Sequence, residues 1–350
     1  MNTKFKRFIL WPIAFLGLLT GFFFAWLYFS ALQVEDTQPE KFSNLPDAPT
    51  LKSGQTIKVL SWNIQFLAGN ENNHFFFDDG EDMWPSSGTR QQILKQIAEV
   101  IIAEQPDIVL LQEVDEGAKR TGYEDQLVAL MALLPAEYGN HASTFYWQAS
   151  FVPHPSLMGA VGMKLSTLSK YRITQATRHA LTGIRSQSWV MQQMNPKRAI
   201  LETQLPFGDS KTLRLLNTHL SAFAQNSDTM EVQVKQVMEV MTKNQTQNVI
   251  IGGDFNLLPS SFAYNLLDDQ GKSYYNPKET ELSLLLNAFN SIPSVENMRG
   301  NDHARWFTYS PNHISAALPD RTIDYLFYSS GLSLVKEDVR SRDTHLISDH

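Results

Sequence analysis

The chain has 350 residues, 43% of them hydrophobic, and is long enough to bury a large core in one or two domains. Its formal net charge of -7 disfavours nonspecific binding to nucleic acid, which normally requires a basic face. The absence of cysteine excludes disulfides and thiolate–zinc sites.

The first predicted element is a long apolar helix. No charged residue occurs from Phe8 to Leu32, and at about 1.5 Å rise per residue this stretch can cross about 30 Å of hydrocarbon. We therefore predict a single-pass transmembrane helix over about residues 8–32, with a cleaved signal peptide as the alternative. Basic residues precede it and acidic residues follow it, which places the N-terminus in the cytoplasm and the body on the periplasmic or extracellular side. Residues 1–54 then comprise a cytoplasmic tip, this helix and a Pro-rich, polar linker over residues 33–54.

Strands and helices alternate from residue 55 onward, which predicts one α/β or α+β domain over residues 55–350. Helices are predicted from Arg90 to Glu104 and from Thr229 to Lys243, where apolar residues recur at steps of three and four. Short apolar runs predict strands near residues 56–62, 107–112, 158–165, 198–205, 212–218, 248–253 and 322–328.

Polar side chains stand at the ends of four of these strands. They are Asn63, Glu113, His219, and Asp254 with Asn256. Groups at the ends of core strands are held stiffly and meet at one edge of the sheets, and carboxylate and amide oxygens suit Mg²⁺. Each has a structural alternative when taken alone: a turn with Asx hydrogen bonds, a solvated acidic loop or a packed histidine.

Two further acids and a histidine lie near the end of the sequence. Asp324 is placed within an apolar strand, and a buried carboxylate needs a partner if it is to remain charged. The segment Ser348-Asp349-His350 supplies an imidazole that Asp324 could orient, as acid–imidazole pairs do in other hydrolases.

In this order and in these strand contexts, the residues resemble the endonuclease/exonuclease/phosphatase superfamily, which includes deoxyribonuclease I. The resemblance covers about residues 55–350, and Pro106-Asp107, Ser169-Lys170-Tyr171 and Lys197-Arg198-Ala199 are weaker matches. It implies a four-layer sandwich of two mainly antiparallel sheets flanked by helices. Family members continue past the Ser-Asp-His segment with a short apolar strand, so we expect the natural chain to extend beyond His350.

The resemblance also implies a role for each position. Glu113, assisted by Asn63 and Asp349, would hold Mg²⁺, with Mn²⁺ as the alternative. Asp254 would position or deprotonate the attacking water, and Asn256 would hold that water and a phosphate oxygen. The catalytic set is completed by His219, Asp324 and His350: the two histidines would donate hydrogen bonds to the phosphoryl group, and Asp324 would orient His350.

The function predicted from these features is a membrane-anchored, Mg²⁺-dependent phosphodiesterase or phosphatase. Its substrate could be a lipid headgroup, a small molecule or a nucleic acid, because fold and metal site fix the reaction class only. The alternatives are a nuclease acting on DNA or RNA and a noncatalytic scaffold. A nuclease requires a basic track beside the site, for which the candidates are Lys164, Lys170, Arg172, Arg178, Arg185, Lys197 and Arg198.

Overall fold

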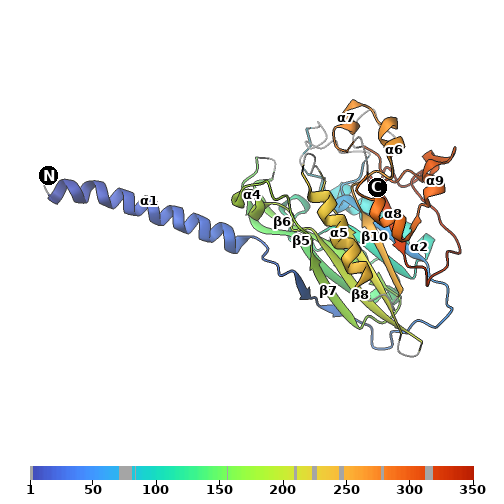
Figure 1. Cartoon of the computed structure of the whole chain (residues 1–350). Coiled ribbons are helices and arrows are strands. Elements are labelled where there is room, and N and C mark those ends of the chain that lie inside the picture. Colours follow the sequence, from blue (N-terminus) through green and yellow to red (C-terminus); the bar gives the residue numbers. More distant parts are fainter. Residues whose placement is uncertain are drawn as a thin grey trace.

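Two β-sheets packed face to face form the centre of the body in this computed structural model (Figure 1). The structure describes residues 3–70, 81–82, 84–155, 157–208, 211–222, 227–243, 248–276, 280–311 and 318–350. The larger sheet has seven strands, and all its pairs are antiparallel except β9 with β10. In spatial order its strands are β1 (Thr37–Pro39), β7 (Gln175–Ala180), β8 (Ala199–Phe207), β9 (Lys211–His219), β10 (Asn248–Asp254), β12 (Asp324–Tyr328) and β11 (Asn290–Ile292).

The smaller sheet has five strands and one parallel pair, β3 with β4. Its other pairs are antiparallel. In spatial order its strands are β2 (Phe42–Ser43), β5 (Asn140–Val152), β6 (Gly159–Ser169), β4 (Ile108–Asp115) and β3 (Val59–Asn63).

Apolar side chains fill three layers between and outside the sheets. Leu110 of the smaller sheet and Leu213 of the larger one belong to the cluster between them. Val234 of α5 (Thr229–Thr242) packs with the outer face of the larger sheet, and Ile97 of α2 (Ser87–Glu104) packs with that of the smaller sheet. Helix, sheet, sheet and helix therefore form four layers, which confirms the predicted sandwich.

Helix α2 shows why the sequence pattern predicted it well. Ser86 caps its N-terminus, because its side chain accepts a hydrogen bond from the backbone of Thr89. Ile93, Ile97 and Ile101 are buried on one face, at the spacing expected of an amphipathic helix.

The other α-helices are α1 (Thr3–Ser30), α3 (Gln126–Met131), α4 (Trp189–Met194), α6 (Ser261–Leu266), α7 (Asp269–Lys272), α8 (Ser283–Ala288) and α9 (Val295–Arg299). The 3-10 helices are η1 (Gln65–Leu67), η3 (Lys119–Thr121), η4 (Ala136–Gly139) and η5 (His303–Trp306).

All seven predicted strands are present, with ends shifted by a few residues, but the short strands β1, β2 and β11 and the longer strands β5 and β7 were not predicted. In β5, three consecutive aromatic residues, Phe145 to Trp147, lie between small and polar ones, and the burial alternates along much of the strand. A pattern of period two is typical of a strand with one buried face. The buried positions include Asn140, Ala142 and Thr144, so neither an apolar run nor an alternation of apolar and polar residues marked this strand in the sequence.

The N-terminal helix α1 projects from the body (Figure 1). Within it, Trp11–Ser30 has a mean hydropathy of 1.8 and is long and apolar enough to cross a membrane, as a core helix or a signal sequence can also be. Part of the segment expected to be a linker is ordered against the body, since β1 pairs with β7 and β2 pairs with β5.

Candidate active site

Strand register brings three of the predicted polar residues side by side. In the parallel pair β9–β10, His219 lies opposite Asp254. In the antiparallel pair β10–β12, Asp324 lies opposite the same Asp254. The central strand therefore carries a carboxylate flanked on both sides by an ionisable residue.

Two glycines allow this close approach at the end of β10. Gly253 has φ = 152°, and a Cβ atom there would lie 1.9 Å from the backbone oxygen of Thr218 on the neighbouring strand. A Cβ at Gly252 would lie 2.6 Å from the side chain of Leu326 and 2.9 Å from that of Leu110, which belongs to the other sheet. Only glycine fits both positions without displacement of its neighbours.

Glu113 reaches the cluster from the smaller sheet through an irregularity in β4. The pairing of β4 with β6 shifts register between Leu111 and Val114, and Glu113 has φ = 58°. Such a bulge redirects a side chain that regular alternation would send elsewhere. Asn63 connects the two sheets, because its Nδ2 lies 3.3 Å from Oε1 of Glu113 and 3.2 Å from Oδ2 of Asp254.

Asp254 is the centre of the arrangement. Besides the contact with Asn63, its Oδ2 lies 3.2 Å from Nε2 of His219 and 3.5 Å from Nε2 of His350. Its Oδ1 accepts a hydrogen bond of 2.9 Å from the backbone N–H of Asn256. The side chain is almost fully buried, with 2% exposed, so these neighbours determine its charge.

His350 is held by the adjacent strand. Its Nδ1 pairs with Oδ2 of Asp324 at 2.8 Å, which directs Nε2 toward Asp254. The same Oδ2 accepts a hydrogen bond of 2.7 Å from the hydroxyl of Thr308. Tyr309 packs against the imidazole, with ring centroids 5.0 Å apart. The pair thus has the geometry predicted from sequence, with a hydroxyl group that further fixes the acid.

The remaining two predicted residues lie in the same cluster. Asn256 adopts φ = 50°, and its Nδ2 donates to the backbone oxygen of Leu220 at 3.3 Å. Asp349 has Oδ1 4.0 Å from Nε2 of His350 and within 3.4 Å of the hydroxyl of Ser348. All eight candidate residues therefore gather at one rim of the two sheets.

Burial and mutual repulsion set the charges at this rim. Burial raises the pKa of Asp254 to about 7, an effect that His350 opposes and that Asp324 and Glu113 reinforce. Burial lowers the pKa of His219 well below its usual value, with Arg198 and His350 adding to the effect. For His350, burial favours the neutral ring, but Asp324 and Asp254 outweigh it and hold the pKa well above the usual value.

The donor set fits a hard divalent cation. Ligand atoms of Asp254, Asp324 and His350 all lie within 4.8 Å of one another. Glu113 joins the same network through Asn63, and Asp349 lies beside His350, so four carboxylates share the rim. A buried carboxyl group whose pKa is near 7 shows that negative charge there is incompletely compensated. A divalent cation held by oxygen donors would supply the missing positive charge.

Sequence reasoning missed Tyr146 and considered Arg198 only as part of a basic track. The hydroxyl of Tyr146, on the unpredicted strand β5, lies 3.3 Å from Nδ1 of His219. The guanidinium of Arg198 stacks over the Tyr146 ring at 5.2 Å, and its buried Nη1 has no hydrogen-bond partner. The sequence of β5 does not alternate between apolar and polar residues, so no local pattern indicated that Tyr146 would lie at this end of the sheet.

Two members of the candidate basic track, Lys164 and Arg178, are buried. Lys164 is buried and pairs with Glu116 at 2.6 Å and with Asp125 at 3.2 Å. Arg178 is fully buried and donates to backbone oxygens of Phe145 and Lys197. These two of the seven candidates therefore make contacts inside the protein and do not contribute to a basic surface.

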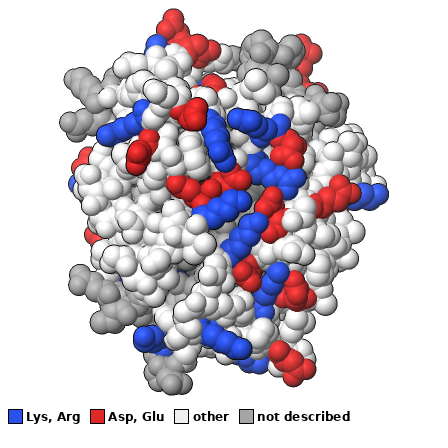
Figure 2. All heavy atoms as spheres, turned by 90° about the vertical axis from the view of Figure 1, so that its right-hand side faces the viewer, with Lys and Arg blue, Asp and Glu red and all other residues white. Residues whose placement is uncertain are grey.

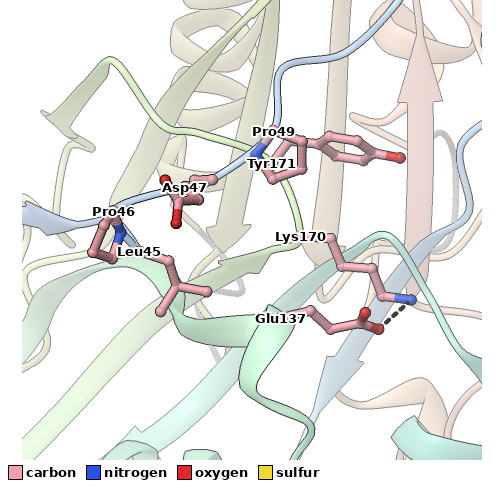
Figure 3. Close-up of a pocket in the computed structure, with 8 residues that line it drawn as sticks. Leu45, Pro46, Asp47, Pro49, Glu137, Lys170 and Tyr171 are labelled. Atoms are coloured by element: carbon pink, nitrogen blue, oxygen red, sulfur yellow. Dashed lines mark ion pairs between the residues drawn. The ribbon is translucent and has the colours of Figure 1, made fainter.

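A cavity of about 500 Å³ lies at the other end of the smaller sheet (Figure 3). Lys170 and Tyr171, which line it, follow β6 directly after Ser169, and Ser169 pairs with Ile108 at the start of β4. Glu113 is near the end of β4, so the cavity is separated from the carboxylate rim by most of a strand. Its ion pair, Lys170 with Glu137 at 2.9 Å, has no contact with the rim.

Comparison with known families agrees with this geometry. Residues 60–350 match the sequence model of the endonuclease/exonuclease/phosphatase family. The chain belongs to this family. It is therefore a phosphoester hydrolase with the fold of this family of metal-dependent enzymes. None of the curated proteins compared with the chain matches its sequence.

The match to one solved structure supports the fold, and two others are similar at lower TM-scores. An endonuclease/exonuclease/phosphatase from Beutenbergia cavernae DSM 12333 is 20% identical, covers 84% of this chain and 69% of its own, and superposes with a TM-score of 0.56. The human Nocturnin catalytic domain with bound sulfate anion is 21% identical, with coverages of 89% and 94% and a TM-score of 0.48. A family protein from Leptotrichia buccalis C-1013-b is 14% identical, with coverages of 79% and 89% and a TM-score of 0.49.

Proposed function

We propose that this family member is a membrane-anchored, Mg²⁺-dependent phosphodiesterase or phosphatase in which Asp254 activates the attacking water. The observation that carries the proposal is the convergence on Oδ2 of Asp254: an amide and two imidazoles lie within 3.2 to 3.5 Å of it. A carboxylate in this position can accept a proton near neutral pH, because burial raises its pKa to about 7.

Three residues then perform the proton transfers and hold the phosphoryl group. Asp254 takes a proton from water as the water oxygen attacks phosphorus. His350, kept protonated by Asp324 and Asp254, donates a proton from Nε2 to the oxygen that leaves. His219, with its low pKa, remains neutral and donates one hydrogen bond to a phosphoryl oxygen.

Glu113 and Asp349, with Asn63, would hold the Mg²⁺ ion, and Mn²⁺ could replace it. When bound, the ion neutralises charge on the phosphoryl oxygens, which is the main requirement of phosphoryl transfer. In the structure, Oδ1 of Asn63 accepts a hydrogen bond of 3.0 Å from the backbone of Gln65, and its Nδ2 faces the carboxylates. In this orientation the amide positions Glu113 and Asp254. Rotation of the amide would turn its oxygen toward the carboxylates, where it could serve as a ligand of the ion.

Arg198 and Tyr146 extend the phosphate site beyond the predicted residues. The Nη1 atom of Arg198 is buried without a partner, and an unsatisfied charged donor is costly to bury. A phosphate oxygen would satisfy it, and guanidinium groups suit such oxygens. Tyr146 fixes both neighbours, since its ring lies under Arg198 and its hydroxyl reaches His219.

Membrane anchoring is proposed from α1, with the body on the extracytoplasmic side. Its span Trp11–Ser30 is only 6% buried within the protein. Basic residues precede the span and acidic residues follow it, which favours a cytoplasmic N-terminus. We therefore expect signal from a C-terminal reporter that functions only outside the cytoplasm. Signal from a C-terminal reporter that functions only in the cytoplasm would contradict this orientation.

A substrate panel tests the enzymatic proposal. Purified protein is assayed with and without Mg²⁺ against bis-p-nitrophenyl phosphate, single- and double-stranded DNA, sphingomyelin and inositol phosphates. We expect Mg²⁺-dependent hydrolysis of lipid or small esters and loss of that activity in Asp254→Ala. Glu231→Gln is the control variant, because this exposed carboxylate lies on α5, where it pairs with Lys235 at 2.5 Å.

The panel separates the alternatives. DNA cleavage lost in Asp254→Ala would make the protein a nuclease, despite the scattered basic residues. No turnover of any substrate, together with no Mg²⁺ binding, would leave a noncatalytic scaffold. Equal activity in Asp254→Ala and Glu231→Gln would contradict the assigned role of Asp254.

A further inference from the structure

The end of α1 is packed against the body and does not emerge as a free tether. Leu27 is 1% exposed and Ala31 is 7% exposed. Ala31 forms a β-bridge with Ala149 of β5, and the backbone N–H of Leu32 donates to Gln148 at 2.7 Å. The direction in which the body leaves the helix is therefore fixed by the structure.

Two segments of the body lie beside the end of α1: helix α4 and the tip of the β5–β6 hairpin (Figure 1). The ring of Trp189 on α4 is 5.9 Å from that of Phe24, and the ring of Phe151 on the hairpin is 6.1 Å from that of Trp26. The indole of Trp147 also donates to the backbone of α4, which joins the hairpin to that helix.

These segments present apolar side chains to the outside. Trp189 is 44% exposed, Met191 is 47% exposed and Met158 is 48% exposed, and Phe151 and Leu157 beside them are half-buried. We call these five residues the juxtahelical patch. Clustered exposed apolar side chains on a protein surface mark a site of contact with another protein, a ligand or a membrane.

The surroundings of the juxtahelical patch are depleted of charge. The sequence from Tyr146 to Met163 contains no Lys, Arg, Asp or Glu, and neither does that from Ser186 to Pro196. Lys119 reaches the hairpin tip from outside these two stretches, where its Nζ donates to the backbone oxygen of Met158 at 2.9 Å. The face of the body that points away from α1, in contrast, carries many charged side chains of both signs (Figure 2).

The depth of the juxtahelical patch follows from its contact with α1. Phe24 lies inside the candidate span, about 9 Å before its end at Ser30, given a rise of about 1.5 Å per residue. Trp189 contacts Phe24, so it lies at the level of the last turns of the span. Tryptophan is enriched at that level, because its ring is apolar and its N–H is polar.

We propose that the juxtahelical patch inserts into the headgroup region of the bilayer and holds the catalytic body in one fixed pose on the membrane. This inference rests on the anchoring role proposed above for α1. The occupant is a lipid surface of any charge, because apolar burial and not charge attraction drives the contact. The body then has two attachments to the membrane, the spanning helix and this patch.

Depth-dependent fluorescence quenching tests the proposal on the full chain, and the absence of native cysteine allows single labels. Cysteine is introduced at Met191, at Met158, at Leu18 in the middle of α1, and at Val335, which is 75% exposed on the body. Each variant is labelled with an environment-sensitive dye and reconstituted in phosphatidylcholine vesicles. The vesicles contain quenchers placed either near the headgroups or deep in the acyl chains.

We expect the labels at positions 191 and 158 to be quenched several-fold more by the shallow quencher than the label at position 335. The label at position 18 should respond to the deep quencher. The same pattern is expected when anionic lipid is added, and shallow quenching that required anionic lipid would overturn the apolar basis of the contact.

Failure of this proposal is distinguishable from failure of the anchor. Deep quenching at position 18, with positions 191 and 158 behaving like position 335, would retain the anchor and overturn the docking of the patch. No quenching at position 18 would overturn the anchor itself. A spectral shift at position 191 without lipid quenching, together with Met191→Cys disulfide dimers, would assign the patch to a second copy of the chain and overturn the lipid contact.

Discussion

Two buried clusters of ionisable residues lie in the larger sheet, and they differ in how their charges are balanced. On its outer face, Glu202 is bound by Arg214 through Nε at 2.8 Å and Nη2 at 2.9 Å, and by Nε2 of His179 at 2.9 Å. The rim holds four carboxyl groups with little positive charge beside them, and these belong to Asp254, Asp324, Glu113 and Asp349. The first cluster is complete within the protein, whereas the second requires a partner from outside.

The pKa values of the two central carboxyl groups express this difference. Burial opposes ionisation of Glu202, but Arg214 and His179 outweigh it and hold its pKa far below the usual range. Burial raises the pKa of Asp254 to about 7, because the nearby imidazole does not offset it. Burial thus disfavours the charge of both carboxyl groups, and the cationic partners of Glu202 determine that it alone is ionised well below neutral pH.

The largest expected effect comes from replacing the carboxylate of the incomplete cluster by its amide. Asp254→Asn should reduce kcat by about 10²–10⁴-fold, as loss of a general base does. The metal-free protein should keep or gain stability, because a carboxyl group with a raised pKa is removed from a crowded acidic site. Steady-state kinetics and urea unfolding measure the two effects, and a stable variant with unchanged kcat would contradict the account.

The same change in the complete cluster should have the opposite result. Glu202→Gln leaves Arg214 buried without its partner, which typically costs about 3–5 kcal/mol of unfolding free energy. The folded fraction should retain kcat within a few-fold. Urea unfolding with activity normalised to folded protein measures this, and loss of activity without loss of stability would show that the two clusters are not separable.

The pH dependence of stability should also differ in sign between the clusters. The metal-free native state keeps the Asp254 proton up to about pH 7, whereas the unfolded chain releases it near pH 4, so the rim contribution to unfolding free energy falls between these values. The depressed pKa of Glu202 gives a contribution that is present above about pH 4.3 and is lost in acid.

Unfolding free energy measured in EDTA from pH 2 to pH 8 checks both signs, because the Glu202 contribution is lost below about pH 4.3 and the Asp254 contribution falls above about pH 4. Asp254→Asn should remove the decline toward pH 7, and Glu202→Gln should weaken the loss in acid. Excess Mg²⁺ should reduce the decline in the parent protein, because the ion favours the ionised carboxylates. A decline of equal size in parent and Asp254→Asn proteins would assign it to another group.

A smaller effect is expected from the arginine of the incomplete cluster. Arg198→Met should raise KM for a phosphodiester about tenfold, the loss of one or two charge-assisted hydrogen bonds, with a smaller change in kcat. It should also raise the pKa of His219, which Arg198 lowers. A pH–rate profile together with the KM measurement distinguishes this role from a packing role, which would leave the pKa of His219 unchanged.

Local sequence patterns predicted the site better than they predicted its supports. Asp254 follows an apolar run and two glycines, so its position at a strand end was readable from neighbouring residues alone. Thr308, which fixes Asp324, was not readable, because the two are joined only by folding of the intervening chain. The position of Tyr146 depends on β5, whose mixed composition hid it.

The cluster of Glu202, Arg214 and His179 could not be predicted from sequence for a related reason. Glu202 lies opposite Thr177 on β7 and opposite Leu216 on β9. His179 and Arg214 are each two residues from those positions, so they are its diagonal neighbours on the sheet. Such a contact depends on the register of three strands, and a shift of one residue would turn Glu202 to the other face.

Direct binding of Mn²⁺, followed by electron paramagnetic resonance, tests most directly whether the rim takes an external cation. The parent protein and Glu202→Gln should bind Mn²⁺ with similar affinity, and Mg²⁺ should displace it. Glu113→Gln and Asp254→Asn should bind it at least tenfold more weakly. Absence of binding to the parent protein, or equal binding by all four proteins, would contradict the claim that the rim is completed by a metal.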